Sequence, residues 1–168
     1  MVYFFDTSAL QHRYIDGPKA RGIRRSITES RNTCYISDFT VLEIASALGT
    51  HCRKNRLPVT AFQRLDQAFW KDIAAGKLRV RNATQRDFLR ARQLLRYAGV
   101  EKKRNIKSAD ALIAASCLEF ALETRQDVTF CLEDWTLYDV VRNITAYRKV
   151  LNFRYIGVDK SLVRGGGH

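Results

Sequence analysis

Four acidic residues stand out because each follows or interrupts an apolar stretch. Asp6 and Asp134 each come at the end of a short apolar run of strand type. Glu43 and Asp110 lie inside stretches that have the apolar spacing of helices, which predicts that both are at least partly buried. Because an isolated buried charge is energetically expensive, these carboxylates require a structural or chemical explanation.

Each acid, taken alone, has an ordinary explanation. Asp6 and Asp134 are suited to capping the turns or helices that follow strands, and Asp110 suits the first turn of a helix. Glu43 is suited to pairing with a basic residue in the core. Taken together, however, the acids converge on one pocket if the strands are parallel, because reactive groups gather at the carboxyl ends of parallel strands.

A pocket that holds several carboxylates needs protons or cations. Two carboxylates about 4 Å apart repel by roughly 4 kcal/mol at an effective dielectric constant of about 20. Hard oxygen ligands with open positions favour Mg²⁺ or Mn²⁺, which also bind phosphate oxygens. One or two such ions would provide Lewis-acid activation for phosphodiester hydrolysis, so the acids predict a metal-dependent nuclease if the substrate is nucleic acid.

The elements that must position these acids alternate along the chain. Short apolar runs predict strands at residues 2–5, 34–36, 78–80, 128–132 and 153–158. Periodic apolar spacing predicts helices within 9–29, with a break near 17–18, and over 39–53 and 139–148. Further helices are predicted to begin at Pro58 or Thr60 and at Thr84, and another to extend to 124 with Ser108 as its cap. This alternation predicts an α/β fold with a mainly parallel central sheet of about five strands, covered by helices on both faces.

Composition narrows the class of partner. The 168 residues include 29 Lys and Arg against 17 Asp and Glu, a net charge of +12, with 46% apolar residues and a mean hydropathy of −0.29. These values exclude a disordered chain, and no apolar run is long enough for a membrane span. The excess charge predicts attraction to nucleic acid, an anionic membrane surface or an acidic protein.

Cysteine usage indicates the compartment. The four cysteines include no C-x-x-C pair, and the three histidines do not have the spacing of a zinc site. We expect reduced, mostly buried thiols, no signal peptide and a cytoplasmic location.

Four segments that contain these acids resemble the motifs of the PIN-domain nucleases. Phe4–Leu10 looks like the opening strand motif of that family, and Val41–Leu48 is similar to its glutamate-bearing helix. Ser108–Ala115 resembles the third motif and is the most specific of the set, and Asp134–Leu137 is similar to the fourth. The resemblance covers residues 1–160 as a single domain, with 161–168 as a flexible tail. Single-domain PIN proteins of this size most often resemble VapC-type toxins of toxin–antitoxin pairs.

The resemblance implies a fold, a reaction and partners. The fold would be a three-layer α/β/α sandwich, and the reaction endonucleolytic cleavage of RNA with Mg²⁺ or Mn²⁺. Asp6, Glu43, Asp110 and Asp134 would be the catalytic and metal-binding acids, with Thr7 and Ser8 as supporting polar residues. An antitoxin and a second copy of the chain are the implied protein partners, and no membrane is involved.

One departure from the family pattern leaves the fourth acid open. The fourth motif usually has Thr or Ser two residues before its Asp, but this position is Leu132. Glu133 directly precedes Asp134, so either acid can fill the role.

Basic residues near the acids are candidates for contacts with the RNA backbone: Arg13, Lys102, Lys103, Arg104 and Lys107. A solvated loop explains the run at 102–107 equally well. The rival functions are a non-catalytic nucleic-acid-binding domain, a PIN-type RNA-processing nuclease without an antitoxin and, least supported, a receiver-like domain.

Overall fold

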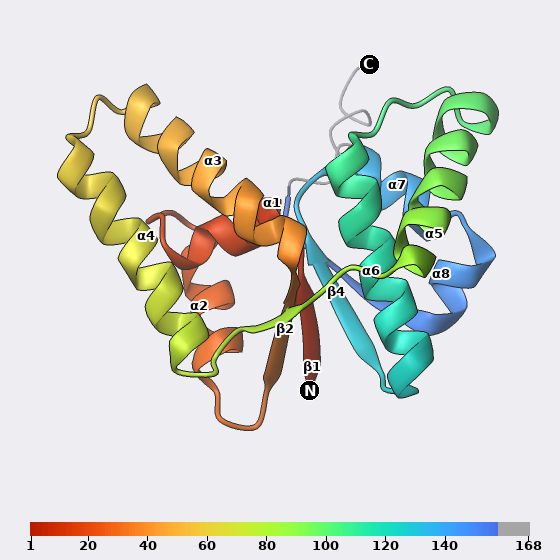
Figure 1. Cartoon of the computed structure of the whole chain (residues 1–168), viewed down its shortest axis with the longest axis horizontal. Coiled ribbons are helices and arrows are strands. Elements are labelled where there is room, and N and C mark those ends of the chain that lie inside the picture. Colours follow the sequence, from red (N-terminus) through yellow and green to blue (C-terminus); the bar gives the residue numbers. More distant parts are fainter. Residues whose placement is uncertain (158–168) are drawn as a thin grey trace, which may run out of the picture.

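The computed structural model describes residues 1–157 and places a parallel sheet between two layers of helices (Figure 1). The five strands lie in the order β3-β2-β1-β4-β5, and every neighbouring pair is parallel. Their bounds are β1 (Val2–Phe5), β2 (Thr33–Ser37), β3 (Arg79–Arg81), β4 (Val128–Leu132) and β5 (Leu151–Tyr155). The α/β class and the three-layer sandwich predicted from the sequence are confirmed.

The helices divide between the two faces of the sheet (Figure 1). One layer contains α1 (Thr7–Leu10), α2 (Ala20–Thr28), α3 (Asp38–Lys54) and α4 (Val59–Ala74), with a 3₁₀ turn at Gln11–Arg13. The other contains α5 (Gln85–Arg96), α6 (Ser108–Thr124), α7 (Trp135–Arg142) and α8 (Thr145–Val150), with a π-helical turn at Tyr97–Glu101. In the part of the chain that the structure describes, no helix is long and apolar enough to cross a membrane.

Strand β1 shows why both faces are covered. Successive side chains of a strand point to opposite faces. Tyr3 and Phe5 pack in the core formed with α1–α4, whereas Phe4 packs in the core formed with α5–α8. The continuous apolar run of this central strand therefore fills two cores at once, as parallel sheets require.

The parallel topology brings the carboxyl ends of β1, β2 and β4 together along one side of the sheet, which is called the sheet edge below. Asp6 follows β1, and helix α3 starts directly after β2. Asp134 lies two residues after β4 and caps α7, because its Oδ1 accepts a hydrogen bond of 2.8 Å from the backbone N–H of Leu137. This edge is where the acids predicted from the sequence are found.

Several boundaries differ from the sequence prediction, and three of these differences concern the candidate site or the last strand of the sheet. The helix predicted over 139–148 is instead two helices, and the first begins at Trp135 because the Asp134 side chain supplies its cap. Strand β5 spans Leu151–Tyr155, so it begins two residues before the predicted start and ends before the predicted end at 158. Lys107, not Ser108, occupies the cap position of α6. Val158 and the tail predicted over 161–168 lie outside the described residues.

Candidate metal centre

Three acidic side chains from different elements meet at the sheet edge. Asp6 comes from the end of β1, Glu43 from α3 and Asp110 from the first turn of α6. Each offers one carboxylate oxygen, and these three oxygens lie within 4.8 Å of one another. Residues more than 100 positions apart in the chain thus form one acidic cluster.

Asp6 is the most buried acid of the cluster, with 2% of its surface exposed. Its Oδ2 accepts hydrogen bonds from the backbone N–H of Ser8 at 3.0 Å and from the Ser8 hydroxyl. Its Oδ1 is buried and has no hydrogen-bond partner among residues 1–157. Burial, reinforced by the charges of Asp110 and Glu43, raises the pKa of Asp6 to about 7, even though the Ser8 hydrogen bonds oppose the shift.

Glu43 and Asp110 complete the cluster from the two helical layers. The Thr7 hydroxyl donates a hydrogen bond of 2.8 Å to Oε2 of Glu43, which ties this carboxylate to the first turn of α1. Burial, then the charge of Glu43, raises the pKa of Asp110 to about 6. Lys107, at the cap position of α6, works in the opposite direction and partly offsets this shift.

This donor set fits a hard divalent cation. The cluster consists of carboxylate oxygens only, and the buried Oδ1 of Asp6 has no protein group to bond. A buried acceptor without a partner is costly, and neighbouring carboxylates that raise one another's pKa values are stabilised by a cation. Oxygen-only sites favour Mg²⁺, Mn²⁺ or Ca²⁺ over softer metals. Asp6, Glu43 and Asp110 are therefore the residues that can hold a metal.

Asp134 and Glu133 have different surroundings. Asp134 lines the same pocket as the three acids, and its charge contributes to the raised pKa of Asp110. Glu133 does not line this pocket, and its carboxylate bonds Nε2 of His12 at 2.5 Å and the ammonium of Lys19. Burial alone would raise the pKa of Glu133, but Lys19 and His12 together outweigh it and lower that pKa. Of the two acids, only Asp134 faces the cluster.

Ser8 links the acidic cluster to the Glu133 ion pairs. Its hydroxyl donates to Asp6 and accepts a hydrogen bond of 2.9 Å from the backbone N–H of Glu133. One short side chain thus holds the end of β1 against the turn that follows β4. The sequence did not indicate the ion pairs of His12 and Lys19 with Glu133, because nothing local in the chain connects these residues with residue 133.

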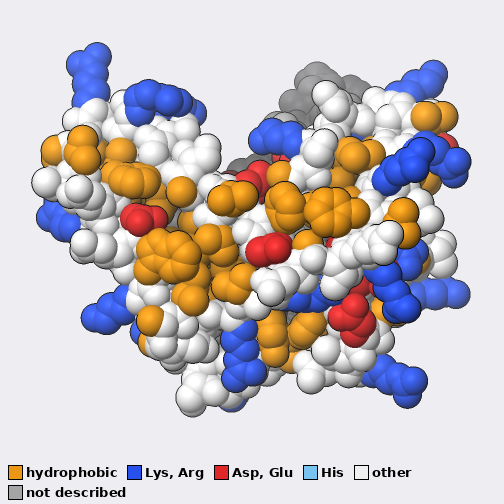
Figure 2. Space-filling view, viewed as in Figure 1, with side chains coloured by type: hydrophobic (Ala, Val, Ile, Leu, Met, Phe, Trp, Pro, Cys, Tyr) orange, Lys and Arg blue, Asp and Glu red, His pale blue; other side chains and the backbone are white. Residues whose placement is uncertain are grey.

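The cluster lies in a cavity of about 330 Å³. Figure 2 shows the molecule hollowed between the α3–α4 side and the α6–α7 side, with acidic side chains at the base of the hollow. Gln11, Ser46 and Thr50 also line the cavity and were not predicted from the sequence. Ser46 and Thr50 are three and seven residues after Glu43 on α3, so their helical spacing was a usable signal.

The predicted RNA-backbone residues fall into different settings. Lys107 lines the acidic cavity. Arg13 does not, since its guanidinium makes two hydrogen bonds, of 2.8 and 3.2 Å, to the buried Asp72. Lys102 lies 5.7 Å from the centre of the Tyr97 ring, and Arg104 is 3.9 Å from Asp139. Lys103 is exposed.

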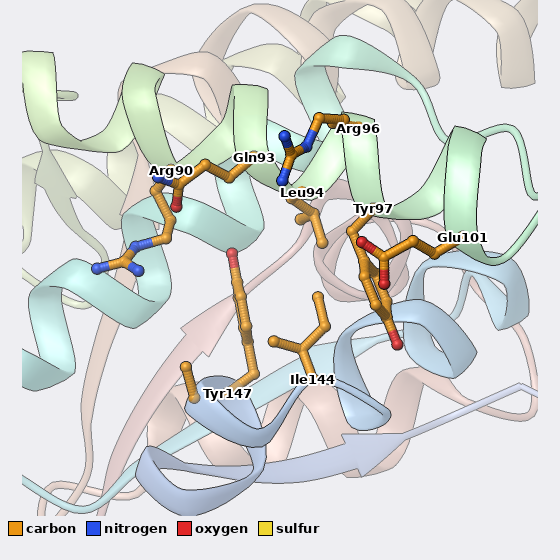
Figure 3. Close-up of a pocket in the computed structure, with 9 residues that line it drawn as sticks. Arg90, Gln93, Leu94, Arg96, Tyr97, Glu101, Ile144 and Tyr147 are labelled. Carbon is orange, nitrogen blue, oxygen red and sulfur yellow. The ribbon is translucent and has the colours of Figure 1, made fainter.

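A second cavity, of about 250 Å³, lies between α5, the π-helical turn and α8 (Figure 3). The Tyr147 ring stands in its wall with the hydroxyl directed toward α5 (Figure 3), and Glu101 is the only acid that lines it within the described chain. A single carboxylate beside arginines offers no metal-binding set. The acidic cavity is therefore the candidate site.

The chain matches a model of a known protein family. Residues 3–125 match the family model described as PIN domain, which is most of the chain. The chain belongs to the PIN domain family. Among curated protein sequences, none is similar enough to match. The family model spans the first three acids of this PIN domain, Asp6, Glu43 and Asp110.

Solved structures share the fold of this PIN domain at low sequence identity. A chain of FitAcB from Neisseria gonorrhoeae has a TM-score of 0.61 at 18% identity, covering 92% of this chain and 97% of that one. A chain of VapBC2 from Rickettsia felis, bound to a DNA fragment from their promoter, has a TM-score of 0.58 at 16% identity, covering 92% and 98%. VapC20 from Mycobacterium tuberculosis, described as a sarcin-ricin loop cleaving toxin, has a TM-score of 0.56 at 17% identity, covering 82% and 93%.

Proposed function

We propose that this PIN domain is an endoribonuclease that depends on Mg²⁺ or Mn²⁺ and serves as the toxin of a toxin–antitoxin pair. The observation that carries the proposal is the cluster of Asp6, Glu43 and Asp110, whose carboxylate oxygens lie within 4.8 Å of one another. These three would hold one or two ions, with Asp134 contributing from the same cavity. A bound ion supplies Lewis-acid activation of the phosphodiester and of water.

The remaining residues of the cavity position the carboxylates and the substrate. Ser8 and Thr7 hold the carboxylates of Asp6 and Glu43 in place through hydrogen bonds. Lys107 lies beside Asp110 and presents a cation to the phosphate that enters the cavity. Preorganised carboxylates and a nearby cation are what hydrolysis of an anionic phosphodiester requires.

RNA is the substrate that charge and likeness favour. A net charge of +12 around an acidic cavity attracts a polyanion and orients its backbone toward the cluster. VapC20, a structure with the same fold, is described as a toxin that cleaves the sarcin-ricin loop. We assign the activity to the cytoplasm, in keeping with four cysteines that are all unpaired and buried.

An antitoxin is the proposed protein partner. Structures with this fold include VapBC complexes from Rickettsia felis and Salmonella typhimurium, both bound to DNA. By analogy, a partner that covers the acidic cavity would hold this nuclease inactive. A second copy of the chain is the other proposed partner, to be measured by the mass of the purified protein in solution.

Cleavage of RNA by matched variants tests the proposal. Asp6→Asn and Asp110→Asn are compared with wild type in Mg²⁺, Mn²⁺ and EDTA, and Asp127→Asn, an exposed acid outside the cavity, is the control. We expect the two cluster variants and EDTA to lower the cleavage rate at least 100-fold, with 5′-phosphate products from the wild type. RNA binding that persists in EDTA, without cleavage in any metal, would instead establish a non-catalytic RNA-binding domain.

The antitoxin is tested separately from catalysis. Expression of wild type alone is expected to arrest growth, and co-expression of the protein from the adjacent reading frame is expected to restore it. Active cleavage in vitro without growth arrest would indicate an RNA-processing nuclease that has no antitoxin.

A further inference from the structure

An apolar groove lies next to the acidic cavity, between the start of α3 and helices α5 and α6. It has a volume of about 400 Å³. Its apolar wall is formed mainly by Phe39, Phe88, Leu95 and Leu112, and its polar lining residues are Arg92 and Ser108. No acidic residue of the described chain lines it, so its chemistry differs from that of the metal centre.

The groove and the acidic cavity are lined by neighbouring residues of the same two helices. On α6, Ser108 and Ala109 line the groove, and Asp110 is the next residue in the cavity. On α3, Phe39 lines the groove and Glu43 lines the cavity. Residues four apart share one face of a helix, with Cβ atoms about 6 Å apart. A ligand that occupies the cavity can therefore extend directly into the groove.

Phe88 is the most accessible ring of the groove, with 52% of its surface exposed. It contacts Phe39 edge-on, with ring centres 5.9 Å apart and ring planes at 78°. Among the described residues no other ring pairs with Phe88, and about half of its surface stays exposed and available for stacking. Single exposed apolar residues are common, but an aromatic pair at the mouth of a groove beside a catalytic cavity marks a binding site.

We propose that this groove binds an unpaired nucleobase adjacent to the scissile phosphate, and that Phe88 is a residue that determines specificity. The proposal rests on the proposed ribonuclease function. Unpaired bases of RNA stack on aromatic side chains and present polar edges for hydrogen bonding. Arg92 supplies paired donors for such an edge. Because two parallel donors match O6 and N7 of guanine, we expect guanine to be the preferred base.

The charges around the groove favour RNA over a second copy of the chain. Arg92 is exposed, and no acidic residue within 1–157 forms an ion pair with it. Lys107 adds a second cation where the groove meets the cavity. A symmetric dimer through the groove would bring two positively charged faces together, which is unfavourable. A nucleotide places a phosphate beside the cations and its base against the rings.

Phe88→Ala tests the proposal, with Leu89→Ala as its matched control. Leu89 is the next residue on α5 and is 55% exposed, but it does not line the groove. The substrates are unstructured RNA oligonucleotides with the cut site mapped for the wild type, in which each nucleotide flanking the cut is changed to A, C, G, U or an abasic residue. We expect one flanking position at which the abasic residue lowers kcat/KM at least about tenfold for the wild type.

Phe88→Ala is expected to lower kcat/KM at least about tenfold on the intact RNA and to cause little further loss on the abasic RNA, because stacking is already absent there. Leu89→Ala is expected to match the wild type on both. Phe88→Trp, which restores a stacking ring, is expected to recover cleavage. Arg92→Gln is expected to reduce the preference for guanine, whereas Arg86→Gln, on the same helix and outside the groove, is not.

Two results would overturn the base-binding groove. One is a loss of kcat/KM for Phe88→Ala on the abasic RNA that equals the product of the two separate losses, which means that Phe88 and the base act independently. The other is a Phe88→Ala variant whose mass in solution differs from that of the wild type while its base preference is unaltered, which makes the groove a protein interface. Failure of the wild type to cleave any RNA contradicts the nuclease instead. Base binding in the groove is then tested with RNA that carries 2-aminopurine. Stacking of this base on Phe88 is expected to quench its fluorescence, and Phe88→Ala is expected to abolish the quenching.

Discussion

The hydroxyl of Thr7 donates a hydrogen bond of 2.8 Å to Oε2 of Glu43 and thereby joins α1 to α3 across the acidic cavity. Thr7 follows Asp6 directly. Asp6 supplies one carboxylate of the cluster, and Thr7 holds the carboxylate of Glu43. Hydrogen bonds of this kind to metal ligands fix their orientation and commonly affect metal affinity 10–100-fold.

Thr7→Val should therefore weaken metal binding while the fold is retained. The substitution keeps the shape of the side chain and removes only the donor to Glu43. We expect an activation constant for Mn²⁺ about tenfold higher and a loss of stability of about 1 kcal/mol or less. Thr124→Val is the control, because the Thr124 hydroxyl bonds only the backbone of its own helix. Equal effects of both variants on the Mn²⁺ requirement would contradict the role of Thr7.

Asp6 should make the stability of the metal-free protein depend on pH. The folded-state pKa of Asp6 is about 7, well above its ordinary value of 3.8. Between these values the folded chain keeps a proton that the unfolded chain loses, so stability falls as pH rises from about 4 to about 7. The free energy of unfolding is measured with urea in EDTA at pH 5 and pH 8. Its decrease between these pH values should be about 2–4 kcal/mol smaller for Asp6→Asn than for the wild type.

Two comparisons make this measurement specific. Asp127→Asn, an exposed acid, should leave the wild-type pH dependence unchanged. Excess Mn²⁺ should stabilise the wild type most at pH 8, where the cluster is fully charged, and should not stabilise Asp6→Asn. A wild-type stability that is flat across this range in EDTA would show that the cluster costs no free energy without metal.

Much of the fold follows from local patterns in the chain, because each strand and helix carries its own signal. Residues 128–132 form a short apolar and β-branched run with charged residues on both sides, and β4 has these bounds in the structure. The end of the sheet was harder to place. The segment 151–155 mixes apolar and polar residues, and its pairing with β4 decides where β5 begins.

Side-chain partners far apart in the chain were beyond local patterns. Asp134 and Glu133 are adjacent, and the sequence did not distinguish them. The choice depends on His12 and Lys19, more than 110 residues away, which hold the carboxylate of Glu133 outside the cavity. Arg13 likewise resembled a free cation, and its pairing with Asp72 depends on how α4 packs against the first turns of the chain.

The different settings of the two adjacent acids predict different defects. Asp134→Ala should lower RNA cleavage at least tenfold, because Asp134 lines the cavity beside Asp110. Glu133→Gln should keep most activity and lose about 1 kcal/mol of stability, because it weakens partly exposed ion pairs with Lys19 and His12. Cleavage rates and urea unfolding of both variants measure the difference. A larger loss of cleavage in Glu133→Gln would make Glu133 the fourth acid.

Arg13 and Lys107 were both predicted to contact RNA, and their surroundings now predict opposite behaviour. Arg13→Ala removes the main partner of Asp72, which is 4% exposed, although Lys77 remains 3.4 Å from it. We expect a loss of about 2–3 kcal/mol of stability, measured by urea unfolding, because a buried carboxylate loses its bidentate partner. RNA affinity, measured without urea under conditions in which the variant is fully folded, should stay near the wild-type value.

Lys107→Ala should produce the reverse pattern, because Lys107 is exposed and lines the acidic cavity. We expect unchanged stability, weaker RNA binding at every sequence, and a salt dependence of log Kd reduced by about one unit of slope, since one phosphate contact is lost. Binding is measured in Ca²⁺ or EDTA so that cleavage does not interfere, with Lys149→Ala, an exposed lysine of α8 outside the acidic cavity, as the control. A salt slope that decreases for Arg13→Ala and not for Lys107→Ala would place the RNA backbone along the Arg13 side of the molecule.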